Sequence, residues 1–179
     1  YETYGMTETV THVAIRQLKS KNAEGEPHFK ALDNIHFEQD ERSCLVIHAP
    51  KLVENKLVTN DVVRLESDTS FDLLGRYDNV INSGGVKLFP EQIEEKLQPV
   101  IDERFIVAGK SDDKLGEKLI LIVENSRDTA ESIAKRIKYL KGITKFEVPK
   151  DIYIIDKFKE TVNGKIQRGE TLKVALGKS

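Results

Sequence analysis

Residues 75–94, GRYDNVINSGGVKLFPEQIE, constrain the fold more than any other part of the sequence, because they place a basic residue, an acidic residue, paired glycines and a helix start in a fixed order. The adjacent Gly84 and Gly85 permit positive φ, so they predict a turn at which a ligand can approach the backbone. Pro90 suits the first turn of a helix. This run is compatible both with an ordinary surface turn that leads into a helix and with a binding site.

The second half of the chain alternates between strand and helix patterns. Apolar runs predict three strands, over residues 104–109, 118–124 and 151–156. Helical spacing predicts helices over residues 128–141 and 168–176, after the short one that begins at Pro90. The middle strand is so apolar that both of its faces should be covered. We expect Asp128 to cap its helix, and Glu91, Glu94 and Glu95 to point outward.

The first part of the chain has the pattern of a small β structure. Residues 1 to about 74 hold short β-type runs, such as residues 44–48 and 61–65, separated by polar turns and without helical periodicity. They predict a small antiparallel sheet or a partial barrel. The predicted fold class is therefore α+β, with a β-rich unit over residues 1–75 and a compact α+β domain over residues 76–179.

Composition limits the partners and the compartment. The 28 lysines and arginines against 30 aspartates and glutamates give a formal net charge of -2, so no basic surface for nucleic acid is expected. No apolar run approaches the roughly 18 residues of a membrane span, and no signal-peptide pattern is present. The single cysteine, Cys44, lies in an apolar run and is predicted to be a buried thiol. The four histidines lack zinc-like spacing, so no structural metal is assigned. The lack of a membrane span, of a signal peptide and of cysteine pairs predicts a soluble cytoplasmic protein.

Two further clusters carry chemistry. Residues 4–9, YGMTET, combine a ring, a glycine, hydroxyls and a carboxylate. Tyr4 offers a flat face to a base, Thr7 a hydroxyl to a phosphate, and Glu8 a hard oxygen to magnesium. Residues 161–168, TVNGKIQR, hold an Asn-Gly turn that projects Lys165. Each cluster, taken separately, is also compatible with ordinary surface structure.

In this order the three blocks resemble the adenylate-forming superfamily, which includes acyl-CoA synthetases, luciferases and the adenylation domains of peptide synthetases. The resemblance runs from residue 4 to about residue 172, and residues 75–94 and 163–168 are its most specific parts. It implies a ligase that uses ATP, Mg²⁺ and CoA to convert a carboxylic acid to an acyl-adenylate and then to an acyl-CoA thioester. Residues 5–12, GMTETVTH, the short connection to Asp61 and residues 75–95 are similar to the o-succinylbenzoate-CoA ligase family of menaquinone biosynthesis.

The resemblance implies roles at the nucleotide for the first cluster. Tyr4 and Gly5 are expected beside the nucleotide, with the ring of Tyr4 against adenine. Thr7 is expected to hydrogen-bond the phosphate of ATP or of the acyl-adenylate, and Glu8 to coordinate magnesium.

The resemblance also implies a ribose site and a hinge. Asp61 is expected to accept hydrogen bonds from the ribose hydroxyls, with Arg76 beside it for the same sugar. The family commonly has glycine where Asn60 stands, so the local geometry is open to change. Asp78 matches the hinge about which the C-terminal domain swings between two working orientations; it is also compatible with a simple turn cap.

Lys165 and the glycine pair are implied to serve the two half-reactions in turn. Lys165 is expected at the α-phosphate during adenylation. Ser83, Gly84 and Gly85 are then expected to line a tunnel for the pantetheine arm of CoA. Lys87 is expected either to contact phosphate or to be an ordinary surface charge.

No Gly-rich phosphate loop precedes Tyr4, although the family grips the β- and γ-phosphates of ATP with one. We therefore expect a C-terminal fragment that is inactive without the N-terminal part of the same enzyme. Most acyl-pocket residues would also lie in that part, which leaves residues 9–12 as candidates here. Two alternatives stay open: a stand-alone module that binds CoA or a carrier arm, and a ligase for a fatty or aryl acid.

Overall fold

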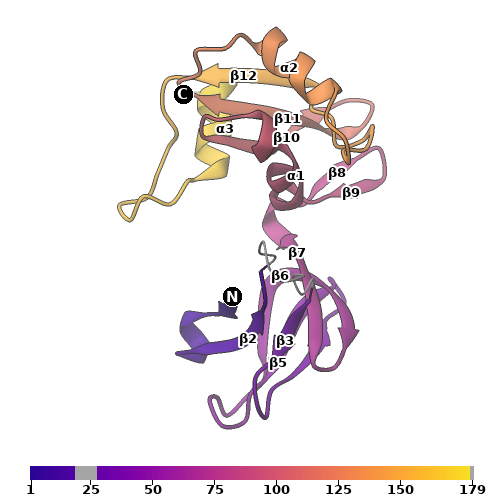
Figure 1. The fold of residues 1–179 in the computed structure, drawn as a ribbon, viewed down its shortest axis with the longest axis vertical. Helices are drawn as coiled ribbons and strands as arrows, with labels where there is room; N and C mark the ends of the chain where they lie inside the picture. Colours follow the sequence, from indigo (N-terminus) through magenta and orange to yellow (C-terminus); the bar gives the residue numbers. More distant parts are fainter. Residues whose placement is uncertain (19–27, 178–179) are drawn as a thin grey trace. The chain divides into compact units, whose positions relative to one another are not determined.

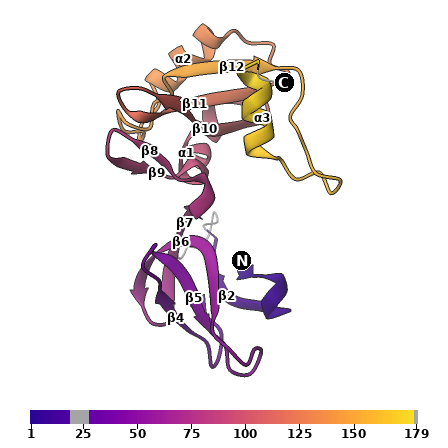
Figure 2. The same cartoon turned by 180° about the vertical axis from the view of Figure 1, so that it is seen from behind.

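A computed structural model describes residues 1–18 and 28–177 of the chain. It divides into two compact units, Tyr1–Asp78 and Asn79–Ser179. The first unit is built of strands, and the second combines strands with helices (Figures 1 and 2). The predicted fold class, an antiparallel β unit followed by a compact α+β domain, is confirmed. Within residues 1–18 and 28–177, no helix is both long enough and apolar enough to cross a bilayer.

The first unit is one antiparallel sheet with the strand order β1-β2-β3-β7-β6-β5-β4. Its strands are β1 (Glu2–Gly5), β2 (His12–Arg16), β3 (Phe29–Ala31), β4 (His36–Gln39), β5 (Cys44–His48), β6 (Leu57–Ser67) and β7 (Ser70–Arg76), with the short 3-10 turns η1 (Thr7–Thr9) and η2 (Tyr77–Asn79). The ring of Phe71, on the middle strand β7, lies 5.3 Å from Tyr4 on edge strand β1 and 4.9 Å from Phe37 on the opposite edge strand β4. Since both edges meet the same central ring, the sheet curls around one core. Cys44 is buried in this unit, as predicted.

The second unit is built around strand β11. Its elements are β8 (Ile81–Ser83), β9 (Val86–Leu88), α1 (Pro90–Leu97), η3 (Gln98–Val100), β10 (Phe105–Asp112), β11 (Gly116–Glu124), α2 (Ala130–Lys138), β12 (Asp151–Ile155) and α3 (Arg168–Ala175). Strand β11 pairs antiparallel with β10 and β8 and parallel with β12. The strands and helices predicted for this half of the chain are therefore present, with small shifts at their ends.

Helices cover both faces of this second sheet (Figures 1 and 2). On one face, Leu119 and Leu121 of β11 join the cluster that α1 and α2 complete. On the other face, Ile120 and Ile122 pack with Phe158 and with apolar side chains of α3. The prediction that β11 is buried on both faces is confirmed, and this burial fixes the sheet on which the predicted site segments are mounted.

The predicted cap of α2 is wrong. Thr129, rather than Asp128, is the N-cap, because its hydroxyl accepts a hydrogen bond from the backbone N–H of Ser132 at 3.2 Å. Asp128 is used differently. Its N–H donates to the hydroxyl of Ser126 at 3.0 Å, and its carboxylate pairs with Arg136 at 2.6 Å.

Candidate functional site

In the first unit the structure brings together three of the predicted nucleotide residues. Asp61 on β6 lies opposite Arg76 on β7 in the sheet register. The Asp61 Oδ1 atom accepts a hydrogen bond from Arg76 Nη1 at 3.1 Å, and Oδ2 accepts one from the Tyr4 hydroxyl at 2.5 Å. The backbone N–H of Asp61 donates to the hydroxyl of Thr59 at 3.0 Å. Each carboxylate oxygen of Asp61 therefore has a partner that fixes its direction.

Tyr4 is embedded in the core of this unit. The residue is 8% exposed, and its ring meets those of Phe29 and Phe71 edge-on. Burial, and then the hydrogen bond to Asp61, raise the pKa of the Tyr4 phenol well above its ordinary range, so the hydroxyl stays a neutral donor. The sequence pointed to the ring of Tyr4 as a stacking surface and missed its hydroxyl as a support for Asp61. The contact of Tyr4 with adenine stays a prediction.

The Thr7–Thr9 turn leaves two of the predicted residues open to solvent. Thr7 and Glu8 are exposed, and within the described residues no side chain pairs with the Glu8 carboxylate. Thr9 is fully buried; its hydroxyl accepts from the N–H of Met6 at 3.1 Å and lies 2.7 Å from the carbonyl oxygen of Thr11. Thr9 therefore shapes the turn, and its place among the acyl-pocket residues stays a prediction.

Gly5 is required by the close approach of the chain after the turn. A Cβ atom at Gly5 would lie 2.7 Å from the carbonyl oxygen of Thr11, which is closer than real Cβ contacts allow. The local fold therefore accounts for a glycine here. Its predicted place beside a nucleotide is an additional proposal.

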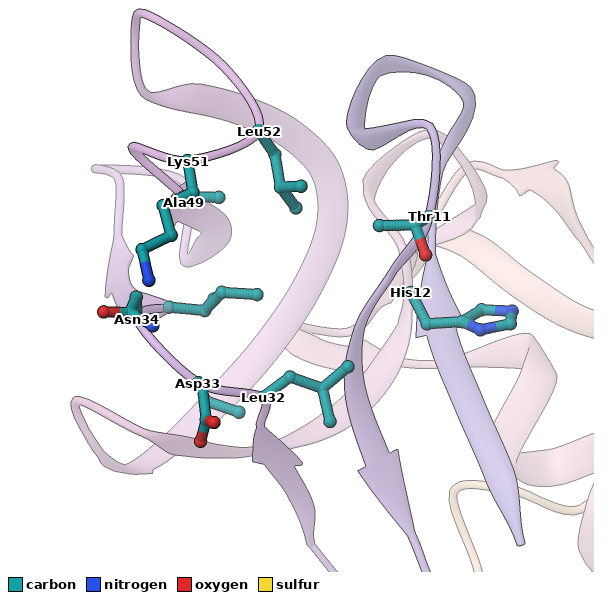
Figure 3. Close-up of a pocket in the computed structure, with 10 residues that line it drawn as sticks. Thr11, His12, Leu32, Asp33, Asn34, Ala49, Lys51 and Leu52 are labelled. Atoms are coloured by element: carbon teal, nitrogen blue, oxygen red, sulfur yellow. The ribbon is translucent and has the colours of Figure 1, made fainter.

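A cavity of about 490 Å³ lies beside residues 11 and 12. Figure 3 shows Thr11 and His12 on one side, with Lys51 and Asn34 on the other. Asp33 also lines it, so the polar lining carries both signs of charge and favours no one charge on a ligand.

One group of described side chains offers metal-type ligands. The ligand atoms of His28, Glu66 and Asp72 all lie within 4.8 Å of one another. However, Arg64 already pairs with Asp72 and lies 3.3 Å from Glu66, while His28 Nδ1 lies 2.5 Å from Asp72. The guanidinium supplies the positive charge, so we interpret the group as a cross-strand ion-pair network.

The predicted hinge residue has a partner in the first unit. Asp78 accepts a hydrogen bond from the side-chain amide of Asn60 at 3.2 Å. The amide oxygen of Asn60 accepts from Arg42 Nη1 at 2.9 Å. The sequence did not predict the Asn60–Asp78 hydrogen bond, because Asn60 stood out there only for its backbone conformation.

Gly84 and Gly85 form the turn of the β8–β9 hairpin, as predicted. Their φ angles of 57° and 81° lie in the region that glycine adopts without strain. Both are exposed, and the N–H of Gly84 donates to the carbonyl oxygen of Leu115 at 2.8 Å, which docks the turn on the β10–β11 connection. Ser83 precedes the turn, and Lys87 is exposed on β9. The turn thus offers open backbone; its contact with CoA stays a prediction.

Lys165 lies on a tight turn, also as predicted. The N–H of Gly164 donates to the carbonyl oxygen of Thr161 at 2.9 Å, and the N–H of Thr161 donates to that of Lys165 at 2.8 Å. Lys165 is exposed, and among residues 1–18 and 28–177 no side chain engages its ammonium group. The turn therefore has a fixed backbone and carries a free cation.

The expectation that Glu94 points outward is wrong. The Glu94 carboxylate is 20% exposed and forms a two-point pair with Arg168, with Nη1–Oε1 at 2.5 Å and Nη2–Oε2 at 2.7 Å. Glu94 also accepts from the N–H of Val107 at 2.7 Å. Burial lowers the pKa of the Arg168 guanidinium, but the hydrogen bonds to Glu94 outweigh it and raise the pKa overall. No role was assigned to Arg168 from the sequence, because nothing local marks a partner that lies 74 residues away.

The chain is similar to acid-CoA ligases. A probable CoA ligase of Humulus lupulus is 35% identical over 114 residues, which are 62% of this chain and 21% of that protein. A solved AMP-forming acyl-CoA synthetase/AMP-acid ligase II-like protein of Dyadobacter fermentans is 36% identical, with a TM-score of 0.54 over 97% of this chain and 50% of that one. The o-succinylbenzoate coenzyme A synthetase of Bacillus subtilis, solved with ATP and magnesium, has a TM-score of 0.65 at 16% identity over 96% of this chain and 41% of that one. No protein-family model matches the chain.

These relatives and structural neighbours are AMP-forming acyl-CoA ligases of the adenylate-forming superfamily. The mixed α+β fold of the chain matches the C-terminal domain of adenylate-forming enzymes. Other relatives are named for oxalate, for medium- and long-chain fatty acids, and for 2,3-dihydroxybenzoate. The chain spans about a fifth of the length of the curated relatives that it matches.

The Tyr4–Asp61 hydrogen bond predicts a loss of stability at alkaline pH. Replacing Tyr4 with Phe should cost about 1–3 kcal/mol of unfolding free energy near neutral pH, because it leaves a buried carboxylate oxygen without its donor. Since the folded-state pKa of Tyr4 is raised, the advantage of the wild type over Tyr4→Phe is fully present below pH about 10 and falls as the pH rises further. Urea unfolding of the wild type and of Tyr4→Phe at several pH values measures this difference in unfolding free energy.

The matched control is Tyr139→Phe, because Tyr139 is 73% exposed and should show no such pH dependence. A difference between wild type and Tyr4→Phe that stays constant above pH about 10 would contradict the buried hydrogen bond.

Proposed function

We propose that this chain is the C-terminal part of an ATP-dependent acid-CoA ligase that forms an acyl-adenylate and then an acyl-CoA thioester. The observation that carries the proposal is Lys165, an exposed cation without a side-chain partner in the described part of the chain, on a turn with a fixed backbone. Sequence similarity to CoA ligases at 35% identity supports the reaction class. The chain matches only about a fifth of the length of these relatives, which supports the proposal that it is a part of a longer enzyme.

In the first half-reaction, a carboxylate oxygen of the acid attacks the α-phosphorus of ATP, and pyrophosphate leaves. Negative charge grows on the α-phosphoryl oxygens, and a positioned ammonium group stabilises it. Lys165 is the residue that we assign to this task, with the hydroxyl of Thr7 donating to the same group. The exposed Glu8 carboxylate fits a magnesium ligand, and bound Mg²⁺ neutralises phosphate charge.

The nucleotide is assigned to the first unit. The Asp61 carboxylate would accept the ribose hydroxyls, and its orientation by Tyr4 and Arg76 supports this assignment. Gly5 would bring the backbone close to the nucleotide, and Tyr4 is assigned to adenine. Lys87 is assigned to phosphate.

In the second half-reaction, the sulfur of CoA attacks the acyl carbon, the thiol proton is released to solvent, and AMP leaves with the electron pair of the broken C–O bond. This step needs a path for a slim thiol arm and no cation at the α-phosphate. We assign the path to Ser83, Gly84 and Gly85, of which the two exposed glycines leave room for pantetheine. Asp78, the last residue of the first unit, is assigned as the pivot of a mobile second unit that withdraws Lys165 between the steps.

The acid that we propose is o-succinylbenzoate, which would place the enzyme in menaquinone biosynthesis in the cytoplasm. Support comes from the amino-acid sequence of residues 5–12, GMTETVTH, and from the likeness in fold to the Bacillus subtilis synthetase. The varied acids in the relatives' names favour a fatty or aryl acid as the second candidate. A stand-alone module that binds CoA or a carrier arm is the candidate from another class, and it would leave Lys165 without a task.

Replacing Lys165 with Ala in the full-length enzyme should lower ATP–pyrophosphate exchange by about 100- to 1,000-fold, because one preorganised charge at a transition state contributes that much. The matched control is Lys157→Ala, since Lys157 is also an exposed lysine and lies outside the turn. Exchange by Lys165→Ala within about threefold of the wild type would contradict the assigned role. Robust exchange by the 179-residue chain alone would contradict the proposal that it is a part of the catalytic unit.

A substrate screen of the full-length protein tests the acid. With ATP and CoA present, o-succinylbenzoate should give the highest kcat/KM when compared with benzoate and with medium-chain fatty acids. A preference of about tenfold or more for benzoate or a fatty acid would overturn the assignment of the acid and leave the reaction class intact.

A further inference from the structure

The turn that carries Lys165 is anchored on both sides. The segment that enters the turn pairs with the segment that leaves it through an antiparallel bridge between Glu160 and Ile166. Next to this bridge, the N–H of Gln167 donates to the carbonyl oxygen of Lys159 at 2.8 Å. On the entering side, the Glu160 carboxylate pairs with Arg104. The base of the turn is therefore tied to the sheet while its tip stays exposed.

The anchor on the leaving side is Arg168, three residues after Lys165 in the sequence. Its guanidinium contacts two elements at once. It holds the Glu94 carboxylate of α1 by two hydrogen bonds, and Nη1 donates to the carbonyl oxygen of Val107 on β10 at 3.1 Å. The side chain of Arg168 is only 24% exposed, whereas that of Arg104 is 51% exposed, so Arg168 is the better shielded of the two anchors.

The geometry of this anchor requires arginine. A planar guanidinium can meet both oxygens of one carboxylate and still donate to a carbonyl group, whereas the ammonium of lysine is a point charge that cannot hold both directions. Three residues of chain span at most roughly 10 Å, so a shift at residue 168 passes to residue 165 with little loss.

The anchor is not needed to hold α3 on the sheet. Leu172 and Ala175 pack against the cluster around Ile120 and Ile122. The buried Thr171 hydroxyl also accepts from the N–H of Lys159 at 3.1 Å. Loss of the Arg168 pair should therefore loosen the base of the turn more than it loosens the helix.

We propose that Arg168 is a positioning residue for Lys165, and that its pair with Glu94 and its bond to Val107 fix the place from which the Lys165 ammonium group acts. This inference rests on the proposed adenylation role of Lys165. Misplacement of a reacting group by about 1 Å typically costs on the order of 100-fold in rate, so a small shift at the base of the turn is sufficient to matter.

The test uses Arg168→Gln, Arg168→Lys and Glu94→Gln in the full-length ligase. Three quantities are measured: the ATP–pyrophosphate exchange rate, the rate of thioester formation from preformed acyl-adenylate, and the urea midpoint. Exchange should fall by about 10- to 100-fold through kcat in each variant, with the KM for ATP and the thioester rate within about threefold of the wild type. The matched control is Arg136→Gln, which breaks the pair between Arg136 on α2 and Asp128, just before that helix, and should leave exchange unchanged.

The double variant Arg168→Gln/Lys165→Ala separates positioning from general damage. Because a positioning residue acts through Lys165, the double variant should exchange no more slowly than Lys165→Ala alone. A further loss in the double variant, or a parallel loss of the thioester step in Arg168→Gln, would overturn the inference. Normal exchange in Arg168→Gln beside an impaired Lys165→Ala would also overturn it while leaving the proposed function standing, whereas normal exchange in Lys165→Ala would remove the proposed function itself.

Discussion

The carboxylate of Glu94 is the interaction on which the second unit's site most depends. It joins helix α1, which carries it, to strand β10 through the N–H of Val107 and to the start of α3 through Arg168. A largely buried charge is tolerated only where hydrogen bonds satisfy it, and here three donors do so. The same contacts set the direction in which the chain leaves the Lys165 turn. The position of a proposed catalytic cation thus follows from a structural ion pair.

The first unit repeats this arrangement with another carboxylate. Asp61 is nearly buried and is held by Tyr4 on one oxygen and by Arg76 on the other. In both units a carboxylate has its direction fixed by hydrogen bonds: Asp61 is itself a proposed ligand residue, and Glu94 holds Arg168, three residues after Lys165. Such preorganisation matters for binding and catalysis, because the protein does not have to reorient its dipoles when charge or a hydroxyl group arrives.

The fold could be predicted from the sequence because its signals are local. The apolar run of β11, the glycine pair of the β8–β9 hairpin and the start of α1 at Pro90 each fix a conformation within a few residues. The cap of α2 was misplaced by one residue, because Asp128 and Thr129 are both good caps and the choice depends on the Asp128–Arg136 pair.

The connections of the site could not be predicted in the same way. The Tyr4–Asp61 bond spans 57 residues and the Glu94–Arg168 pair spans 74, and each residue alone is compatible with a solvent-facing place. No periodicity marks such a pair in one sequence. The turn that carries Lys165 was visible because Asn-Gly is a local signal, but its anchor was not. The ligand roles of the residues that the sequence selected remain predictions.

A double-mutant cycle between Arg168 and Glu94 tests the central claim most directly. Native-state hydrogen exchange of the β11 amides gives the unfolding free energy of the second unit in the wild type, in Arg168→Met, in Glu94→Gln and in the double variant. The account predicts a coupling of about 1–3 kcal/mol, clearly above the roughly 0.2–1 kcal/mol typical of an exposed pair such as Glu170–Lys173. A coupling no larger than that of the exposed pair would contradict the claim that this carboxylate organises the base of the Lys165 turn.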